Sequence, residues 1–275
     1  MRLFSRRRLL VKDNNLMLKF AANLSMMFNE LPFLDRFSAA ADAGFHGVEY
    51  LFPYEFPAEA IQERLRGHHL ENVMFNLAPG NWSAGDRGLT CIPGRESEFR
   101  HSVETAISYA TRLKTSRVHA MAGIVPAGAD PAAVEAVYIG NLRYAAGKLA
   151  AHGITLLIEA INTRDMPGFY LNTQAQSYAV CAAVNVPNIR MQMDLYHMQI
   201  MEGDLAMKLR KYLPHCGHIQ VAGAPERHEP DGGEVNYTYL FGVLEELGYD
   251  GWIGCEYRPA GKTVDGLGWF RAALR

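Results

Sequence analysis

The chain has 275 residues, of which 49% are hydrophobic and 20% charged, and its 27 basic and 29 acidic side chains leave a net charge of −2. This composition excludes collagen-like, disordered and coiled-coil chains, and the balanced charge gives no general attraction to nucleic acid or to an anionic membrane. The sequence contains no run of about 18 apolar residues, the length that predicts a bilayer span. Its four cysteines are far apart, which argues against a small disulfide framework and is typical of a protein from the cytoplasm.

Residues 1–16 differ from the rest of the chain. Their basic side chains outnumber their acids and are Arg2, Arg6, Arg7, Arg8 and Lys12. The apolar stretch within them is shorter than the run of about 7 or more residues that a signal peptide needs. A nucleic-acid-binding arm and a transit peptide stay open, but we expect a disordered or non-native extension, with the folded domain spanning residues 17–275.

From residue 17 onward, short apolar runs alternate with longer segments of helical periodicity, the pattern of βα units around a parallel sheet. The predicted strands are 18–24, 48–51, 71–77, 117–121, 154–159, 189–194, 218–222 and 252–256. The predicted helices are 33–43, 57–68, 96–113, a helix from Pro131 to a stop at Gly153, 173–184, 202–213, 236–247 and 264–274. A doubly wound sheet is the competing fold, but no GxGxxG motif follows the first strand. Eight such units match the size of a TIM barrel, so the sequence predicts a single-domain α/β protein with a (β/α)8 barrel.

Four predicted strands end in or near a side chain with an oxygen ligand. Glu159 ends the fifth strand, Asp194 the sixth and Glu256 the eighth, and Gln220 lies late in the seventh. In TIM barrels the chemistry takes place where the strands end. A lone acid at a strand end is more often a helix cap or one half of an ion pair, but several crowded carboxylates repel one another unless a cation lies between them. Oxygen ligands without cysteine or histidine predict Mg²⁺ or Mn²⁺ rather than Zn²⁺.

Further candidates lie close to these strand ends. His197 follows the sixth strand, and Arg227 and His228 lie in the loop after the seventh. The planar fork of an arginine suits a substrate carboxylate. His119 and Glu49 fall at predicted strand ends and are candidates either for substrate contact or for internal hydrogen bonding. No GxSxG motif indicates a nucleophile.

Several segments of the chain resemble the hydroxypyruvate isomerase family, which belongs to the xylose isomerase-like TIM barrels. They are FAANLSMMF (20–28), GVEYLFPYEFP (47–57), CIPGRESEF (91–99), DLYHMQIMEGD (194–204), RHEPDGGEVNY (227–237) and GWIGCEYRP (251–259). The resemblance extends from about Met17 to Arg275. It implies a metal-dependent isomerase that acts on a small hydroxy-oxo acid and needs no organic cofactor.

The resemblance also implies roles for individual residues. It places the metal ligands on Glu159, Asp194, Gln220 and Glu256, and the two catalytic glutamates on Glu159 and Glu256. Related sugar epimerases have an Asp-x-x-His and an Arg that match Asp194, His197 and Arg227. They usually carry His where this chain has Gln220, which argues further against zinc.

The implied reaction interconverts hydroxypyruvate and 2-hydroxy-3-oxopropanoate, also called tartronate semialdehyde. One glutamate removes a proton beside a carbonyl, giving an enediolate, and the other returns it at the neighbouring carbon. The metal ion stabilises the charge, while Arg227 or His197 orients the substrate carboxylate.

Three alternatives stay open. A neighbouring group in the same family isomerises four-carbon 2-oxo-tetronates, although residues 161–171 and 194–204 favour hydroxypyruvate. A nuclease of the endonuclease IV type would need a histidine-rich zinc cluster and a basic face, and a non-catalytic binding module would need only the barrel. We expect a small-molecule substrate and no nucleic-acid or membrane partner, and a homo-oligomer remains open.

Overall fold

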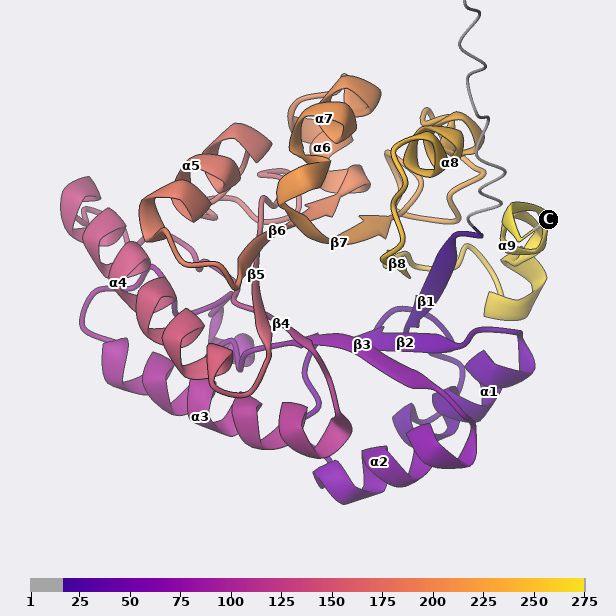
Figure 1. Ribbon diagram of the computed structural model, residues 1–275, viewed down its shortest axis with the longest axis horizontal. Coiled ribbons are helices and arrows are strands. Elements are labelled where there is room, and N and C mark those ends of the chain that lie inside the picture. Colours follow the sequence, from indigo (N-terminus) through magenta and orange to yellow (C-terminus); the bar gives the residue numbers. More distant parts are fainter. Residues whose placement is uncertain (1–16, 275) are drawn as a thin grey trace, which may run out of the picture.

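The computed structural model describes residues 17–274 and forms a closed barrel of parallel strands in the order β1 to β8 (Figure 1). The strands are β1 (Lys19–Asn23), β2 (Gly47–Tyr50), β3 (Glu71–Asn76), β4 (Arg117–His119), β5 (Thr155–Glu159), β6 (Ile189–Asp194), β7 (Cys216–Val221) and β8 (Trp252–Cys255). β8 pairs with β1, which closes the sheet on itself. The predicted TIM barrel is therefore confirmed, and the extension predicted for residues 1–16 lies outside the described residues.

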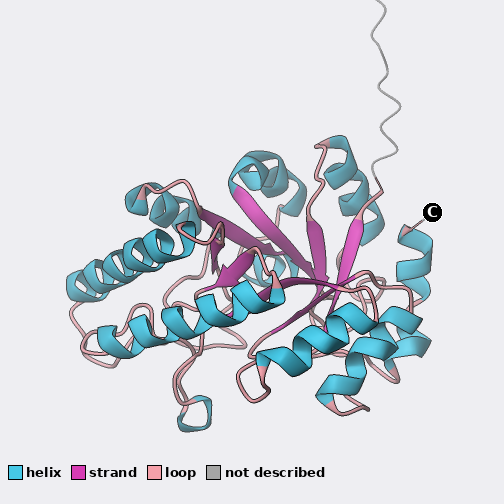
Figure 2. Ribbon diagram, turned by 60° about the horizontal axis from the view of Figure 1, so that its bottom comes forward, coloured by secondary structure: helices cyan, strands magenta, loops and turns pink. Residues whose placement is uncertain are grey.

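Helices surround the barrel and cover the outer face of its strands (Figure 2). They are α1 (Arg36–Asp42), α2 (Ala58–Gly67), α3 (Glu96–Leu113), α4 (Pro131–Ala150), α5 (Gln174–Val184), α6 (Leu195–Met201), α7 (Leu205–Tyr212), α8 (Tyr237–Glu246) and α9 (Gly268–Ala273). Short 3-10 turns are η1 (Phe33–Asp35), η2 (Trp82–Ala84), η3 (Leu213–His215) and η4 (Thr263–Gly266). Within residues 17–274, no helix combines the length and apolarity that a bilayer crossing requires.

Three of the predicted helices differ from the structure. The segment predicted as one helix over 202–213 begins only at Leu205, and the additional helix α6 precedes it. Asp204 has a φ of 53°, a left-handed conformation that ends one right-handed helix and separates it from the next. The segment predicted as a helix over 264–274 is divided into η4 and α9, and the segment predicted over 33–43 is divided into η1 and α1.

The main apolar core lies between the strands and the surrounding helices. A second and smaller cluster consists of Ala21, Val73, Met74 and Leu157, with Trp252 packed against it. Leu157 lies two residues before Glu159 on β5, and side chains two residues apart on a strand point to the same face. This cluster therefore fills the barrel interior on the side away from the strand ends and supports the polar residues above it.

Candidate active site

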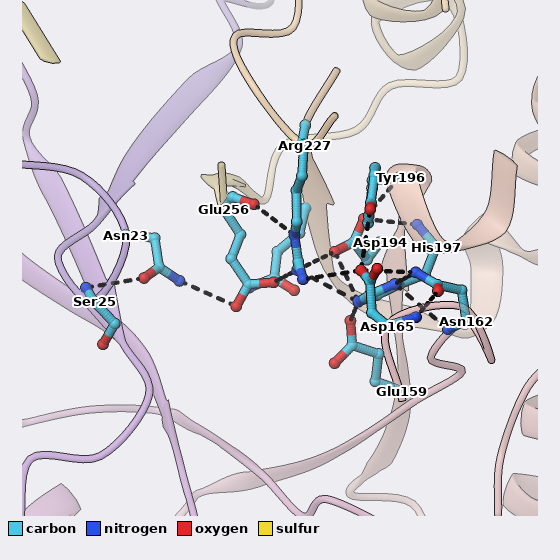
Figure 3. A network of polar contacts seen from close by, with 12 residues as sticks. Asn23, Ser25, Glu159, Asn162, Asp165, Asp194, Tyr196, His197, Arg227 and Glu256 are labelled. Atoms are coloured by element: carbon cyan, nitrogen blue, oxygen red, sulfur yellow. Dashed lines mark hydrogen bonds and ion pairs between the residues drawn. The ribbon is translucent and has the colours of Figure 1, made fainter. Parts of the chain in front are cut away.

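The ends of β5, β6 and β8 bring three carboxylates together in the barrel mouth (Figure 3). Glu159 and Asp194 are the last residues of their strands, and Glu256 directly follows β8. His197, from the first turn of α6, joins them. One ligand atom from each of the four residues lies within 4.8 Å of the others, and all four side chains are buried. This cluster of Glu159, Asp194, His197 and Glu256 could hold a metal ion.

Asp194 both ends β6 and starts α6. Its Oδ1 accepts hydrogen bonds from the backbone N–H groups of Tyr196 and His197, at 2.7 and 3.3 Å. These bonds satisfy free donors of the first helical turn, as an N-cap does. Its Oδ2 lies 3.6 Å from His197 Nε2 and 3.5 Å from Arg227 Nη2. Asp194 therefore positions His197 through the backbone and contributes its own charge to the cluster.

Asn162 fixes the protonation pattern of His197. The Asn162 Oδ1 accepts from the backbone N–H of Asp165 at 2.7 Å, and its Nδ2 lies 3.1 Å from Asp165 Oδ2 and 2.6 Å from His197 Nδ1. Because the amide NH₂ faces the ring, Nδ1 must accept, and the proton of a neutral imidazole then resides on Nε2. Burial lowers the pKa of His197 well below its ordinary value, so the ring is neutral. In this state Nε2 carries the ring proton and faces the cluster, 3.6 Å from Asp194 Oδ2, 3.9 Å from Glu159 Oε1 and 3.4 Å from Arg227 Nη2.

Arg227 is buried among the carboxylates. Its Nη2 forms an ion pair with Glu256 Oε2 and lies 3.5 Å from Asp194 Oδ2, and its Nη1 lies 3.7 Å from Asp165 Oδ2. The guanidinium also lies over the ring of Tyr196, with its Cζ 4.9 Å from the centroid. The positive charge of Arg227 is therefore already compensated within the protein.

The two glutamates lie in surroundings that favour their protonated forms. Burial raises the pKa of Glu159 well above its ordinary value, and the charges of Glu256 and Asp194 add to the effect. Burial likewise raises the pKa of Glu256 to about 8, although Arg227 acts in the opposite direction. A raised pKa makes a carboxyl group a better proton acceptor and lets it hold the proton for return, as general acid–base chemistry requires.

Among the described residues, three buried polar atoms of side chains that line the cavity lack a hydrogen-bond partner: His119 Nε2, Glu159 Oε1 and Gln192 Oε1. His119, at the end of β4, lies with Nε2 3.8 Å from Glu159 Oε2, while its Nδ1 is 3.2 Å from Asn76 Oδ1. Burial lowers the pKa of His119 to about 3, so this ring is neutral as well. Buried polar atoms are almost always satisfied, so these atoms are suited to contact a bound ion or substrate.

Gln220 belongs to a polar layer just below the cluster. Its Nε2 donates to Glu49 Oε1 at 2.7 Å, and its Oε1 accepts from Gln192 Nε2 at 2.6 Å. Glu49 Oε2 lies 2.6 Å from His218 Nε2, and Asn23 Nδ2 links Glu49 Oε1 to Glu256 Oε1 at 3.0 and 3.3 Å. We call Glu49, Gln220, Gln192, His218 and Asn23 the polar layer. It is joined to the cluster through Asn23, and Glu49 lies in it rather than in the cluster.

Four residues of the site were not predicted from the sequence, namely Asn23, Asn162, Gln192 and His218. A signal existed for the strand residues, because His218 and Gln220 alternate with Ile219 and Val221, the period of a strand with one polar face. His228, predicted near the site, directs its Nδ1 to the carbonyl of Arg258 at 2.7 Å.

A cavity of about 270 Å³ opens onto the cluster and is lined by Glu159, Glu256, His119, His197 and Arg227, among others. Trp82, Arg87 and Arg258 also line it, and these three side chains are exposed or half-buried. Pockets for drug-sized ligands measure roughly 300–1,000 Å³. The dimensions of this cavity therefore suit a small metabolite.

The family model described as "Xylose isomerase-like TIM barrel" matches residues 37–273. The chain belongs to this family. It is 56% identical to a 2-oxo-tetronate isomerase of Cupriavidus necator, an alignment that covers 93% of this chain and 98% of the relative. It is 46% identical to a hydroxypyruvate isomerase of Escherichia coli, with 92% and 98% covered. A crystal structure described as an AP endonuclease, family 2, from Brucella melitensis is 54% identical and superposes with a TM-score of 0.91, covering 93% of this chain and 99% of that one.

Proposed function

We propose that the protein isomerises a short 2-oxo acid by moving a proton between neighbouring carbons, with Glu159 and Glu256 as the acid–base pair. The observation that carries this proposal is the placement of two carboxyls with raised pKa values, from β5 and from the end of β8, in one small buried cavity. One removes the proton beside the substrate carbonyl, and the other supplies a proton at the adjacent carbon. Proton transfer by such positioned groups contributes about 10²–10⁴-fold to a rate.

The donor set fits a divalent cation, and we propose Mg²⁺ or Mn²⁺. Glu159, Asp194 and Glu256 offer carboxylate oxygens, which these ions prefer, and Glu159 Oε1 lacks a partner among the described residues. When bound, such an ion supplies Lewis acidity to the substrate oxygens. The inclusion of Gln220 as a fourth ligand rests on the family resemblance, because both ends of its amide are bonded within the polar layer.

His197 has a separate role in this proposal. Because its Nε2 carries the proton, it donates toward the oxygen on which negative charge develops as the enediolate forms. Preorganised donors of this kind stabilise such charge without rearranging during the reaction. Asp194 and Asn162 hold the imidazole in this orientation.

The length of the substrate separates two versions of the proposal. The sequence motifs favour hydroxypyruvate, whereas the identity of 56% to a relative named 2-oxo-tetronate isomerase exceeds the 46% to one named hydroxypyruvate isomerase. The two acids differ by one CHOH unit and undergo the same proton transfer. The similarity supports the four-carbon acid more strongly, and both belong in the first assay.

A nuclease activity has weaker support. The similar structure from Brucella melitensis is described as an AP endonuclease, but the net charge of −2 gives little attraction to DNA.

We propose that the protein resides in the cytoplasm. Its four cysteines are free among the described residues, which agrees with a reducing compartment.

The proposal is tested by assaying metal-stripped protein with hydroxypyruvate and a 2-oxo-tetronate side by side, before and after addition of Mg²⁺ or Mn²⁺. We expect turnover of at least one acid to depend on the added ion. A metal-loaded protein that converts neither acid would refute the substrate class. Retention on DNA that weakens with salt would instead support the nuclease.

A further inference from the structure

An acid substrate brings a negative charge into a cavity already lined by carboxylates. Glu159, Glu256 and Asp165 line it, and the cationic side chains among its lining residues are Arg87, Arg227 and Arg258. Like charges repel at short range in a site of low dielectric. Among the side chains of the cavity, the group best suited to bind the substrate carboxylate is therefore an arginine whose charge is not already compensated.

Arg227 does not meet this requirement. It forms an ion pair with Glu256 and lies within 4.0 Å of carboxylate oxygens of Asp194 and Asp165. A substrate carboxylate that took Arg227 would have to displace it from Glu256. That displacement would leave a buried carboxylate unpaired, which is costly.

Arg258 meets it. It follows Glu256 by two residues, beyond the end of β8, and both residues line the cavity while the intervening Tyr257 is buried in the core. The side chain of Arg258 is exposed at the cavity. Its backbone is fixed, because its N–H donates to the carbonyl of Arg227 at 2.8 Å and its carbonyl lies 2.7 Å from His228 Nδ1. Within residues 17–274, the guanidinium of Arg258 has neither a hydrogen-bond partner nor an ion-pair partner closer than 4.0 Å.

Arg87 is the remaining cation. Its Nη1 donates to the carbonyls of Trp82 and Asp86, at 3.1 and 2.7 Å, and its guanidinium lies over the Trp82 ring with Cζ 3.9 Å from the centroid. These contacts use part of its donor capacity and hold it against the loop that follows β3. In contrast, the N–H donors of the Arg258 guanidinium all remain available to a ligand.

We propose that Arg258 binds the carboxylate of the substrate and so selects acids over neutral sugars of the same length. This inference rests on the proposed isomerisation of an acid in the same cavity. The planar fork of Arg258 matches a carboxylate with two parallel hydrogen bonds. Because Arg258 and Glu256 are two residues apart and line the same cavity, binding the carboxylate there would also place the neighbouring carbons toward the acid–base pair.

The test measures binding separately from turnover. Glycerate keeps the carboxylate and hydroxyls of a three-carbon substrate but has no carbonyl, so it cannot be isomerised. Its dissociation constant is measured by calorimetry on metal-loaded wild type, Arg258→Gln, Arg258→Lys and Arg87→Gln, with Arg271→Gln as the matched control. Arg271 is an exposed arginine on α9 that does not line the cavity.

We expect Arg258→Gln to weaken glycerate binding by about 10- to 100-fold, the usual range for one charge-assisted contact. Arg258→Lys should recover part of the loss, Arg271→Gln should bind as wild type does, and the melting temperatures should agree. The proposal is overturned if Arg258→Gln binds glycerate normally, if Arg87→Gln causes the larger loss, or if wild type binds glycerate no better than glycerol. If wild type converts neither acid but its glycerate binding still depends on Arg258, the proposed reaction is refuted while the role of Arg258 in binding carboxylates stands.

Discussion

Gly254 on β8 leaves the space that the Glu49 carboxylate occupies. A Cβ built at Gly254 would overlap with both oxygens and with Cδ of Glu49. The end of a flexible side chain can usually move aside. Glu49, however, is fully buried and its carboxylate is held by His218, Gln220 and Asn23.

Gly254→Ala should therefore destabilise the protein strongly. Inserting a methyl group into a packed interior costs about 1–3 kcal/mol. Displacing the Glu49 carboxylate would also weaken hydrogen bonds to a charged group, each worth about 1.5–3 kcal/mol. With one such bond lost, the free energy of unfolding falls by about 2.5–6 kcal/mol, a large share of the roughly 5–15 kcal/mol typical of a folded domain.

Urea unfolding followed by circular dichroism measures this loss, with Gly147→Ala in α4 as the matched control. Gly147 is an exposed helical residue where an added Cβ meets nothing within 4 Å. The same substitution there should stabilise the protein by roughly 0.5–1 kcal/mol, because alanine favours a helix over glycine. If the free energy of unfolding of Gly254→Ala lies within about 1 kcal/mol of the wild-type value, the carboxylate of Glu49 is not fixed by its hydrogen bonds.

Three further results are expected. Glu256→Gln keeps the side-chain volume but removes the proton acceptor, so isomerase turnover should fall by about 10²–10⁴-fold with unchanged circular dichroism; a near-normal rate would exclude its role. Mn²⁺ at about 100 times its dissociation constant should stabilise metal-stripped protein by about 2.7 kcal/mol, or roughly 5–10 °C in a thermal melt, and no shift would contradict the metal site. The bidentate pair with Arg95 lowers the pKa of Asp86, so its stabilisation of about 0.5–1 kcal/mol is present above about pH 4 and disappears as the pH falls further. Urea melts of Asp86→Asn should therefore differ from wild type at pH 7 and agree with it near pH 2.

The periodicity of the sequence was sufficient to predict the barrel but not to predict where every helix begins. Asp130 before Pro131 predicted the start of α4, and the structure shows Asp130 Oδ1 accepting from the N–H of Ala132 at 3.1 Å. α6 was missed because its cap, Asp194, is also the last residue of a strand. The usual loop signal between a strand and a helix is therefore absent.

The candidate site was predictable to the level of strand ends. Glu159, Asp194 and Glu256 meet because neighbouring strands of a barrel end at one rim, which follows from topology alone. Whether Arg227 contacts a substrate or a protein carboxylate depends on the path of its loop, and sequence spacing does not determine that path. The partners of Gln220 lie across the barrel interior on β2 and β6, and they emerge only once the register of the strands is known.

The two carboxylate oxygens of Asp194 have different partners, and this limits how many of them could bind a metal ion. Oδ1 is used by two N–H groups at the start of α6, so rotation of the carboxylate would cost the helix its cap. Asp194 can therefore offer an ion only Oδ2, as a monodentate ligand. An asparagine at this position could keep the helix cap through its carbonyl oxygen yet would present an NH₂ group to the ion, which separates the structural task of this residue from its chemical one.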